Sequence, residues 1–158
     1  MSHRLDAIDL RILKELQADG RITNVALAQR VGITPPPCLR RVRALEEAGF
    51  ISGYHARLDP KLLGYELTAF AMVGLHSQAE ADLRAFENRV LSWPLVRECF
   101  MLSGETDFIL KCIAPDLTTF HEFITRELTA APNVATVKTS LAIRRAKEEP
   151  GLPIVVRE

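Results

Sequence analysis

The sequence predicts an α+β protein, with an N-terminal winged helix-turn-helix of three helices and a C-terminal ferredoxin-like domain. Residues 23–50 contain two helix patterns separated by a turn at Gly32, and the second helix is rich in arginine. Residues 67–145 then alternate between strand and helix patterns in the order β-α-β-β-α-β. A chain of 158 residues is long enough for two small domains of this kind.

The changes of pattern along the chain predict four segments. Residues 1–50 are expected to form the helix-turn-helix, and residues 51–66 a wing and linker that begins with a short strand pair or wing. The ferredoxin-like domain is expected over 67–146, followed by a C-terminal tail over 147–158.

The first helix is predicted over residues 5–20 from a single apolar stripe. The stripe consists of Leu5, Ile8, Ile12 and Leu16. Asp6 is placed to cap the N-terminus of this helix, and Gly20 to take the left-handed position that ends it. A second helix is expected to be capped by Thr23 and to stop at Gly32.

The third helix begins with Thr34 as its expected cap, followed by three consecutive prolines. A capping hydroxyl normally accepts a hydrogen bond from the second or third helical N–H, and both are missing here. We therefore expect the Thr34 hydroxyl to remain free to contact a phosphate. Since the prolines also remove backbone donors that could face DNA, side chains must supply more of the contact.

A turn of about 100° per residue predicts which side of the third helix each side chain occupies. Leu39, Val42 and Leu45 are expected to share the inward side. Arg40 then points away from the core and is the candidate for a base-edge contact. Arg41 and Arg43 lie on the flanks and are candidates for phosphate contacts or a structural ion pair. The alternative is a solvated basic face paired with Glu46 and Glu47.

The distribution of charge is compatible with a nucleic-acid partner although the net charge is zero. Residues 1–62 hold ten Lys and Arg against seven Asp and Glu, a local excess of +3. Residues 63–158 hold ten against thirteen, which gives −3. A phosphate-contacting surface needs only such a local excess of cations.

Apolar residues occupy both faces of the predicted strands, although two helices can cover only one face of a four-stranded sheet. In the strand that begins at Leu67, Phe70 and Met72 fall on the face opposite Ala69 and Ala71. An exposed apolar face of this size favours a homodimer in which two sheets pack together. The alternative is a monomer whose C-terminal tail folds over the sheet.

The segment Ser103–Asp107 is expected where the two central strands meet. It needs no function as a bare hairpin turn. As a site, Asp107 could hold the ammonium of a free amino acid, while N–H groups near Gly104 could hold the carboxylate.

Other classes of function find little support in the sequence. His121-Glu122 begins like a metalloprotease helix, but Thr125 stands where the second histidine is required. Three cysteines form neither a disulfide framework nor a zinc site. No apolar run is long enough for a membrane helix, and the N-terminus lacks a signal-peptide core. We therefore expect a cytoplasmic protein without enzymatic activity, metal or cofactor.

These blocks together resemble the Lrp/AsnC, or feast/famine, family of transcription regulators. The resemblance extends over nearly the whole chain, from the first helix through the arginine-bearing helix to the hairpin near Gly104 and the helix start near Leu117. It implies a DNA-binding domain and a C-terminal domain called RAM (regulation of amino-acid metabolism). It also implies homodimers that assemble to tetramers or octamers and bind an amino-acid effector between dimers.

Carried onto this chain, the resemblance implies two sets of site residues. The expected DNA-binding residues are Asn24, Thr34, Pro36, Arg40, Arg41 and Arg43. The expected effector-binding residues are Met101, Gly104, Thr106, Asp107, Leu117, Thr139 and Ser140. Ser140 stands where some amino-acid-responsive members have an aromatic residue, so leucine should not be assumed as the effector. The alternative function is an effector-sensing oligomer with weak or no specific DNA binding.

Overall fold

The computed structural model describes residues 4–156 and divides the chain into two compact units. The first unit consists of residues up to 57 together with the segment from residue 147 onward, and the second consists of residues 58–146. The C-terminal segment therefore belongs to the same unit as the N-terminal helices.

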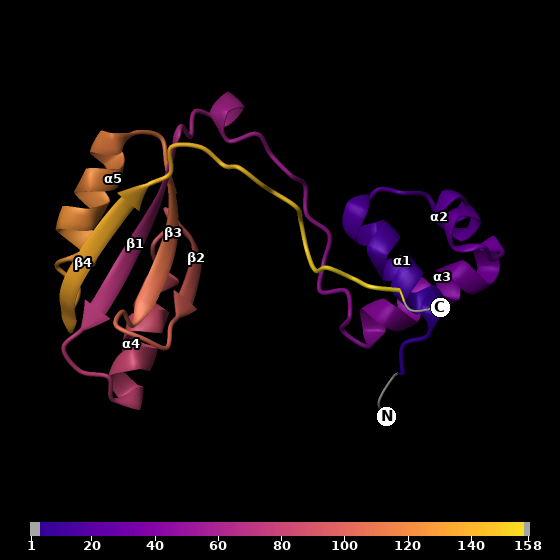
Figure 1. Cartoon of the computed structure of the whole chain (residues 1–158), viewed down its shortest axis with the longest axis horizontal. Helices are drawn as coiled ribbons and strands as arrows, with labels where there is room; N and C mark the ends of the chain where they lie inside the picture. Colours follow the sequence, from indigo (N-terminus) through magenta and orange to yellow (C-terminus); the bar gives the residue numbers. More distant parts are fainter. Residues whose placement is uncertain (1–3, 157–158) are drawn as a thin grey trace. The chain divides into compact units, whose positions relative to one another are not determined.

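In the described residues of the first unit there are three helices (Figure 1): α1 (Ala7–Ala18), α2 (Asn24–Val31) and α3 (Pro35–Glu47). The predicted caps of α1 and α2 are confirmed. Asp6 accepts from the backbone N–H of Asp9 and forms a capping box with it, while Thr23 accepts from the N–H of Ala26. The apolar faces of α1, α2 and α3 meet in one core, whose buried members are Ile12, Leu27, Ala28, Val31, Cys38 and Leu45.

Two local expectations for this unit are wrong. The residue that caps the C-terminus of α1 is Asp19, in an extended conformation, and Gly20 has no positive φ. No strand forms between residues 51 and 59, so the expected strand pair of the wing is absent from this part of the described chain. A strand requires a ladder of backbone hydrogen bonds to a second strand, and the described residues 51–59 belong to no such ladder. The turn after them contains a short 3-10 helix, η1 (Lys61–Leu63), which Gly64 ends with a φ of 80° as expected. Pro60 is its N-cap residue, and the carboxylate of Asp59 accepts from the N–H groups of Lys61 and Leu62.

The second unit is a four-stranded antiparallel sheet with the order β2-β3-β1-β4. Its elements are β1 (Leu67–Leu75), α4 (Glu80–Val90), β2 (Val96–Met101), β3 (Phe108–Ala114), α5 (Leu117–Phe123), the π-helix η2 (Ile124–Leu128) and β4 (Val134–Leu141). This is the predicted βαββαβ arrangement. One expectation is wrong: β2 is an edge strand, so the hairpin near Gly104 joins an edge strand to a central one.

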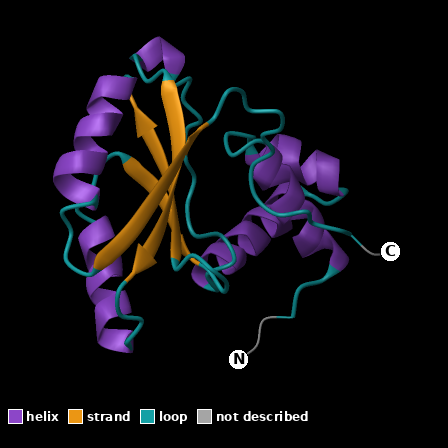
Figure 2. Ribbon diagram, turned by 60° about the vertical axis from the view of Figure 1, so that its left-hand side comes forward, coloured by secondary structure: helices purple, strands orange, loops and turns teal. Residues whose placement is uncertain are grey.

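Both long helices of this unit cover the same face of the sheet (Figure 2). That face carries the core, which includes Ala71, Val73, Phe108 and Leu110, all fully buried. On the other face Phe70 and Met72 are only half-buried, and Phe100 is 55% exposed. Within residues 58–146 this second face has no helix over it. Among the described residues, no helix is long and apolar enough to cross a membrane.

Candidate DNA-binding and effector-binding sites

The turn between α2 and α3 is held by a backbone conformation and by one side chain. Gly32 takes the left-handed conformation with a φ of 79°, and its N–H donates to the carbonyl of Ala28. Asn24, at the start of α2, donates from Nδ2 to the carbonyl oxygen of Pro35 at 2.8 Å. Among the residues that the structure describes, the buried side-chain Oδ1 of Asn24 has no hydrogen-bond partner. The structure thus places Asn24 at the junction of the two helices, where it positions the start of α3.

The proline-rich start of α3 behaves as expected. Thr34 is the N-cap and makes no side-chain capping bond, because the first turn is built from prolines. Thr34 and Pro36 are both exposed, and Pro36 lies on the same side of α3 as Arg40 and Arg43, at offsets of four and seven residues. This outward side of the helix is the candidate DNA-contacting surface.

The inward side of α3 differs from the expectation at one position. Leu45 is fully buried and Val42 packs against the core, but Leu39 is 39% exposed. Cys38 takes the inward position instead and is fully buried. Cys38, Val42 and Leu45 fall at offsets of 0, 4 and 7, which is itself a helical stripe, and it leaves Leu39 on the outer side.

Arg41 has a structural role that the sequence left open. Its Nη1 atom lies 2.8 Å from Oδ2 of Asp6 and 2.7 Å from Oδ1 of Asp9, so it ties α3 to the start of α1. Asp9 is the one charged residue recorded as buried in the described chain, with an exposed fraction of 4%. The backbone N–H of Asp9 and the guanidinium of Arg41 lower the pKa of Asp6, and hydrogen bonds to Asp9 and Asp6 raise the pKa of Arg41. Of the two roles predicted for Arg41, the structure shows the ion pair.

Arg40 and Arg43 remain exposed on the outer side of α3. Within residues 4–156 neither of them has a recorded ion pair, so the alternative, a basic face paired with Glu46 and Glu47, does not form. Glu46 instead accepts a hydrogen bond from the hydroxyl of Tyr54 at 2.8 Å. Burial and this carboxylate raise the pKa of Tyr54 to about 12. Two cationic side chains are thereby left available to a phosphate or base.

The C-terminal segment packs on α1 within the same unit. Gln17 exchanges two hydrogen bonds with the backbone of Leu152: Nε2 donates to the carbonyl at 2.7 Å, and the N–H donates to Oε1 at 2.8 Å. Arg57 and Glu148 form an ion pair at 2.6 Å. The alternative in which this tail folds over the sheet is therefore not what the structure shows.

The predicted effector residues do not gather in one place in a single chain. Met101, Gly104, Thr106 and Asp107 lie on the hairpin between β2 and β3, where Gly104 has a φ of 150°. Leu117 follows the opposite end of β3, and a strand of this length spans about 20 Å. On β4, Thr139 lies opposite Ala71 on the helix-covered face and Ser140 opposite Phe70 on the other face.

Asp107 is partly engaged by its own unit. Its Oδ2 accepts a hydrogen bond from the N–H of Leu75 at 2.6 Å, and its N–H donates to the carbonyl of Val73. This bond falls where the pairing of β1 with β4 shifts register between Gly74 and Leu75. In the described part of the chain Oδ1 has no recorded hydrogen bond, so one carboxylate oxygen is available to a ligand.

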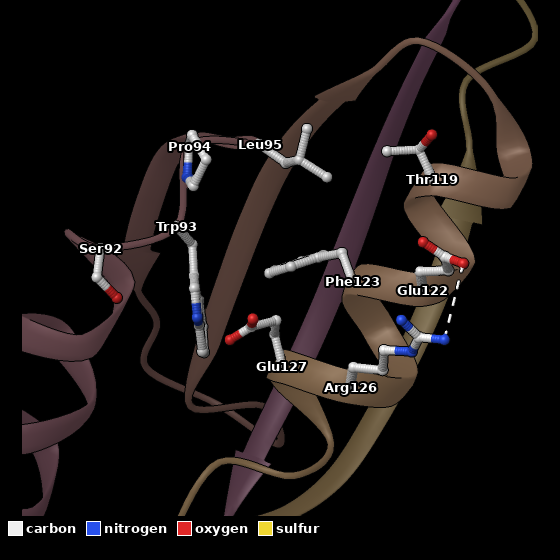
Figure 3. Close-up of a pocket in the computed structure, with 9 residues that line it drawn as sticks. All are labelled: Ser92, Trp93, Pro94, Leu95, Thr119, Glu122, Phe123, Arg126 and Glu127. Atoms are coloured by element: carbon white, nitrogen blue, oxygen red, sulfur yellow. Dashed lines mark ion pairs between the residues drawn. The ribbon is translucent and has the colours of Figure 1, made fainter.

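A surface cleft of about 370 Å³ lies elsewhere in this unit, between α5 with η2 and the turn before β2 (Figure 3). Its residues are Ser92, Trp93, Pro94, Leu95, Thr119, Glu122, Phe123, Arg126 and Glu127. Trp93 and Phe123 meet edge to face with ring centroids 5.4 Å apart, and Glu122 pairs with Arg126 at 3.9 Å. None of the predicted effector residues lies in this cleft. No sequence pattern predicts this cleft, because its two sides come from segments separated by more than twenty residues.

Two family models match the chain over the two parts just described. A model described as winged helix-turn-helix DNA-binding matches residues 5–52, and one described as Lrp/AsnC ligand binding domain matches residues 68–152. The chain belongs to the Lrp/AsnC family. As a member of this family it is a transcriptional regulator with a DNA-binding helix-turn-helix and a ligand-binding domain, and the alternative without specific DNA binding finds no support.

Individual relatives agree with this membership in the Lrp/AsnC family. The chain is 62% identical to the leucine-responsive regulatory protein of Rhizobium meliloti, over 91% of this chain and 92% of the relative. It is 42% identical to the Bkd operon transcriptional regulator of Pseudomonas aeruginosa, over 89% and 92%. A transcriptional regulator from Neisseria meningitidis, solved as its complex with L-methionine, superposes with a TM-score of 0.90 at 38% identity, covering 95% of this chain and 97% of that one.

Proposed function

We propose that this Lrp/AsnC regulator contacts DNA through the outer side of α3. The observation that carries the proposal is that Arg40 and Arg43 are exposed on one side of this helix without a recorded ion pair in the described chain. Arg40 is assigned to a base edge and Arg43 to a phosphate, with Thr34 and Pro36 beside them at the helix start. Asn24 contributes by holding the start of α3 through the carbonyl of Pro35. Arg41 acts through its ion pairs with α1, not by contact with DNA.

Fluorescence anisotropy with full-length protein and duplex selected from random sequence tests these assignments. Arg43→Ala should weaken binding to all sequences and reduce the salt slope of the affinity by about one. Arg40→Ala should relax the preference at one base pair, at a cost of about 1–3 kcal/mol for the preferred base. Arg89→Ala, an exposed arginine on α4, is the matched control. If both α3 variants behave like this control, α3 does not contact DNA as proposed.

We propose further that the ligand of the second unit is an amino acid. This is supported by the Neisseria relative in complex with L-methionine and by the name of the leucine-responsive relative. The free Oδ1 of Asp107 suits an ammonium group, and the hairpin at Gly104 offers backbone N–H groups to a carboxylate. Met101, Thr106, Leu117, Thr139 and Ser140 are assigned to the same effector response. Within one chain these residues lie too far apart to contact a single amino acid together. The site therefore combines residues from more than one copy of the chain.

A thermal-shift screen against the free amino acids identifies the effector. A ligand present at about 100 times its dissociation constant adds roughly 2.7 kcal/mol of stability. Asp107→Asn should weaken the response, while Glu105→Gln, an exposed neighbour on the same hairpin, should leave it intact. A flat profile across all amino acids would refute the assignment of an amino-acid effector.

We also propose a homodimer that forms through the open face of the sheet and assembles to a tetramer or octamer. The support is the apolar character of this face, where Phe70, Met72 and Phe100 are not covered by the helices. Light scattering on the full chain should give at least twice the monomer mass, and Phe100→Lys should lower it. A solitary wild-type subunit at micromolar concentration would contradict the proposal.

We assign residues 1–50 to DNA binding, 51–66 to a wing and linker, 67–146 to effector binding and assembly, and 147–158 to a tail. The protein acts in the cytoplasm, where its DNA is, and by binding without catalysis. Kinship to transcriptional regulators supports these assignments.

A further inference from the structure

The outer side of α3 is not purely cationic. Pro36, Leu39, Arg40 and Arg43 fall at offsets of 0, 3, 4 and 7, so they form one stripe along the helix. Leu39 is 39% exposed and lies one helical turn from both Pro36 and Arg43. Within residues 4–156, Cys38, Val42 and Leu45 form the side of α3 that packs on the core of this unit. A partly exposed apolar side chain thus lies at the edge of the candidate DNA-contacting surface, beside its arginines.

Leucine can recognise only one feature of the major groove. It neither donates nor accepts a hydrogen bond, so it gains nothing from the polar atoms of the base edges. The thymine C5-methyl group is the apolar group that B-DNA exposes there. The charge of this stripe favours DNA as its partner. Arg40 and Arg43 are exposed and have no recorded ion pair in the described residues, so they can pair with the anionic backbone that borders the groove.

We propose that Leu39 is a specificity-determining residue that contacts the C5-methyl group of a thymine next to the base contacted by Arg40. The inference rests on the proposed contact of α3 with DNA. It adds a base preference that the arginines do not supply, because guanidinium groups recognise guanine edges and phosphates. Removing the methyl group from this thymine should weaken binding about fourfold, the value of one buried methyl-sized group.

The test replaces thymine by uracil, which removes the methyl group and leaves base pairing intact. Sites are first selected from random duplexes with the full-length protein, and each thymine is then replaced singly. For the wild-type protein one position should show the fourfold loss. Leu39→Ala should bind the thymine and uracil duplexes equally, and Leu39→Met should restore the preference. Leu91→Ala, an 85% exposed leucine in the other unit, should retain the wild-type preference.

The outcomes separate this inference from the proposed DNA contact. If no uracil substitution weakens binding, or if the loss persists in Leu39→Ala, the assignment of Leu39 is wrong. If Arg40→Ala loses its base preference in the same duplexes while uracil has no effect, only the Leu39 inference fails. If selection yields no sequence motif, both fail. Thermal melting of each variant followed by circular dichroism establishes that the DNA-binding unit is folded.

Discussion

Replacing Arg41 with alanine should destabilise the DNA-binding unit by about 2 kcal/mol. The substitution leaves Asp9 buried, with 6% of its side chain exposed, without the guanidinium that lies 2.7 Å away. Removing one partner of a fully buried ion pair costs about 3–5 kcal/mol. The Arg41 side chain is 33% exposed and that of Asp6 is 50% exposed, so solvent screening reduces the expected loss to about 2 kcal/mol.

Urea unfolding of the full chain measures this destabilisation with an internal reference. The one tryptophan of the sequence, Trp93, lies in the second unit, so its fluorescence reports that unit alone. Far-UV circular dichroism follows the helices of both units. With a denaturant dependence of about 1 kcal/mol/M, Arg41→Ala should lower the midpoint of the first unit by about 2 M while the tryptophan transition stays in place.

Arg43→Ala is the matched control, because it removes an arginine from the same helix without breaking a recorded ion pair. Combining Arg41→Ala with Asp9→Asn should recover part of the loss, since the buried negative charge of Asp9 is then removed together with the guanidinium that it faces. Arg41→Ala should also leave the salt slope of DNA binding unchanged. Equal midpoints for the Arg41 and Arg43 variants, or a reduced salt slope for Arg41→Ala, would refute the ion-pair role.

Three further predictions follow from single contacts. Gly151→Ala should make the C-terminal tail accessible to proteases, because Gly151 has a φ of 78° and a Cβ there would lie 2.2 Å from the Gln17 side chain. Gln17→Ala should have the same effect, because it removes both hydrogen bonds to Leu152. In an ultraviolet titration, one of the two tyrosines should ionise near pH 12, and this step should be missing in Tyr54→Phe. Because the pKa of Tyr54 is higher in the folded state, its contribution to stability is complete below about pH 10 and is lost as the pH rises to about 12. Burial raises the pKa of Cys99 and Cys112 to about 11, so neither thiol should react quickly with a disulfide reagent at pH 8 until the protein is unfolded. Three results would contradict these predictions: a protease-resistant tail in both variants, two tyrosines that ionise near pH 10, or rapid modification of both thiols in the folded protein.

Features that depend on a few neighbouring residues were predictable. Asp6 and Thr23 cap their helices, and Gly32 ends α2, because each acts on backbone groups within four residues along the chain. The alternation of strands and helices in the second unit was predictable for the same reason. Gly20 shows the limit of such arguments: a glycine near a helix end permits a left-handed stop, but α1 ends at Asp19 without one.

Features that depend on partners distant in sequence were not predictable. From the sequence, Arg41 could contact a phosphate or a carboxylate, and its partner Asp9 lies 32 residues away along the chain. The apolar spacing of Leu39, Val42 and Leu45 predicts Leu39 on the inward side of α3, and only the packing shows that Cys38 occupies that position. Asp107 bonds to Leu75 across two strands, which leaves a single carboxylate oxygen for a ligand.

The sequence by itself determined the order of the helices and strands, the arginine-bearing helix and membership in the Lrp/AsnC family. Periodicity and capping determine the order of the elements, because they act through the backbone over one or two turns. Family membership rests instead on the similarity of whole blocks of sequence to known members. Only the tertiary structure decided which charged and apolar side chains of α3 remain available for DNA. That choice depends on which carboxylates and apolar surfaces the fold brings within a few ångströms of each side chain, because ion pairs and dispersion contacts fall away steeply beyond that distance.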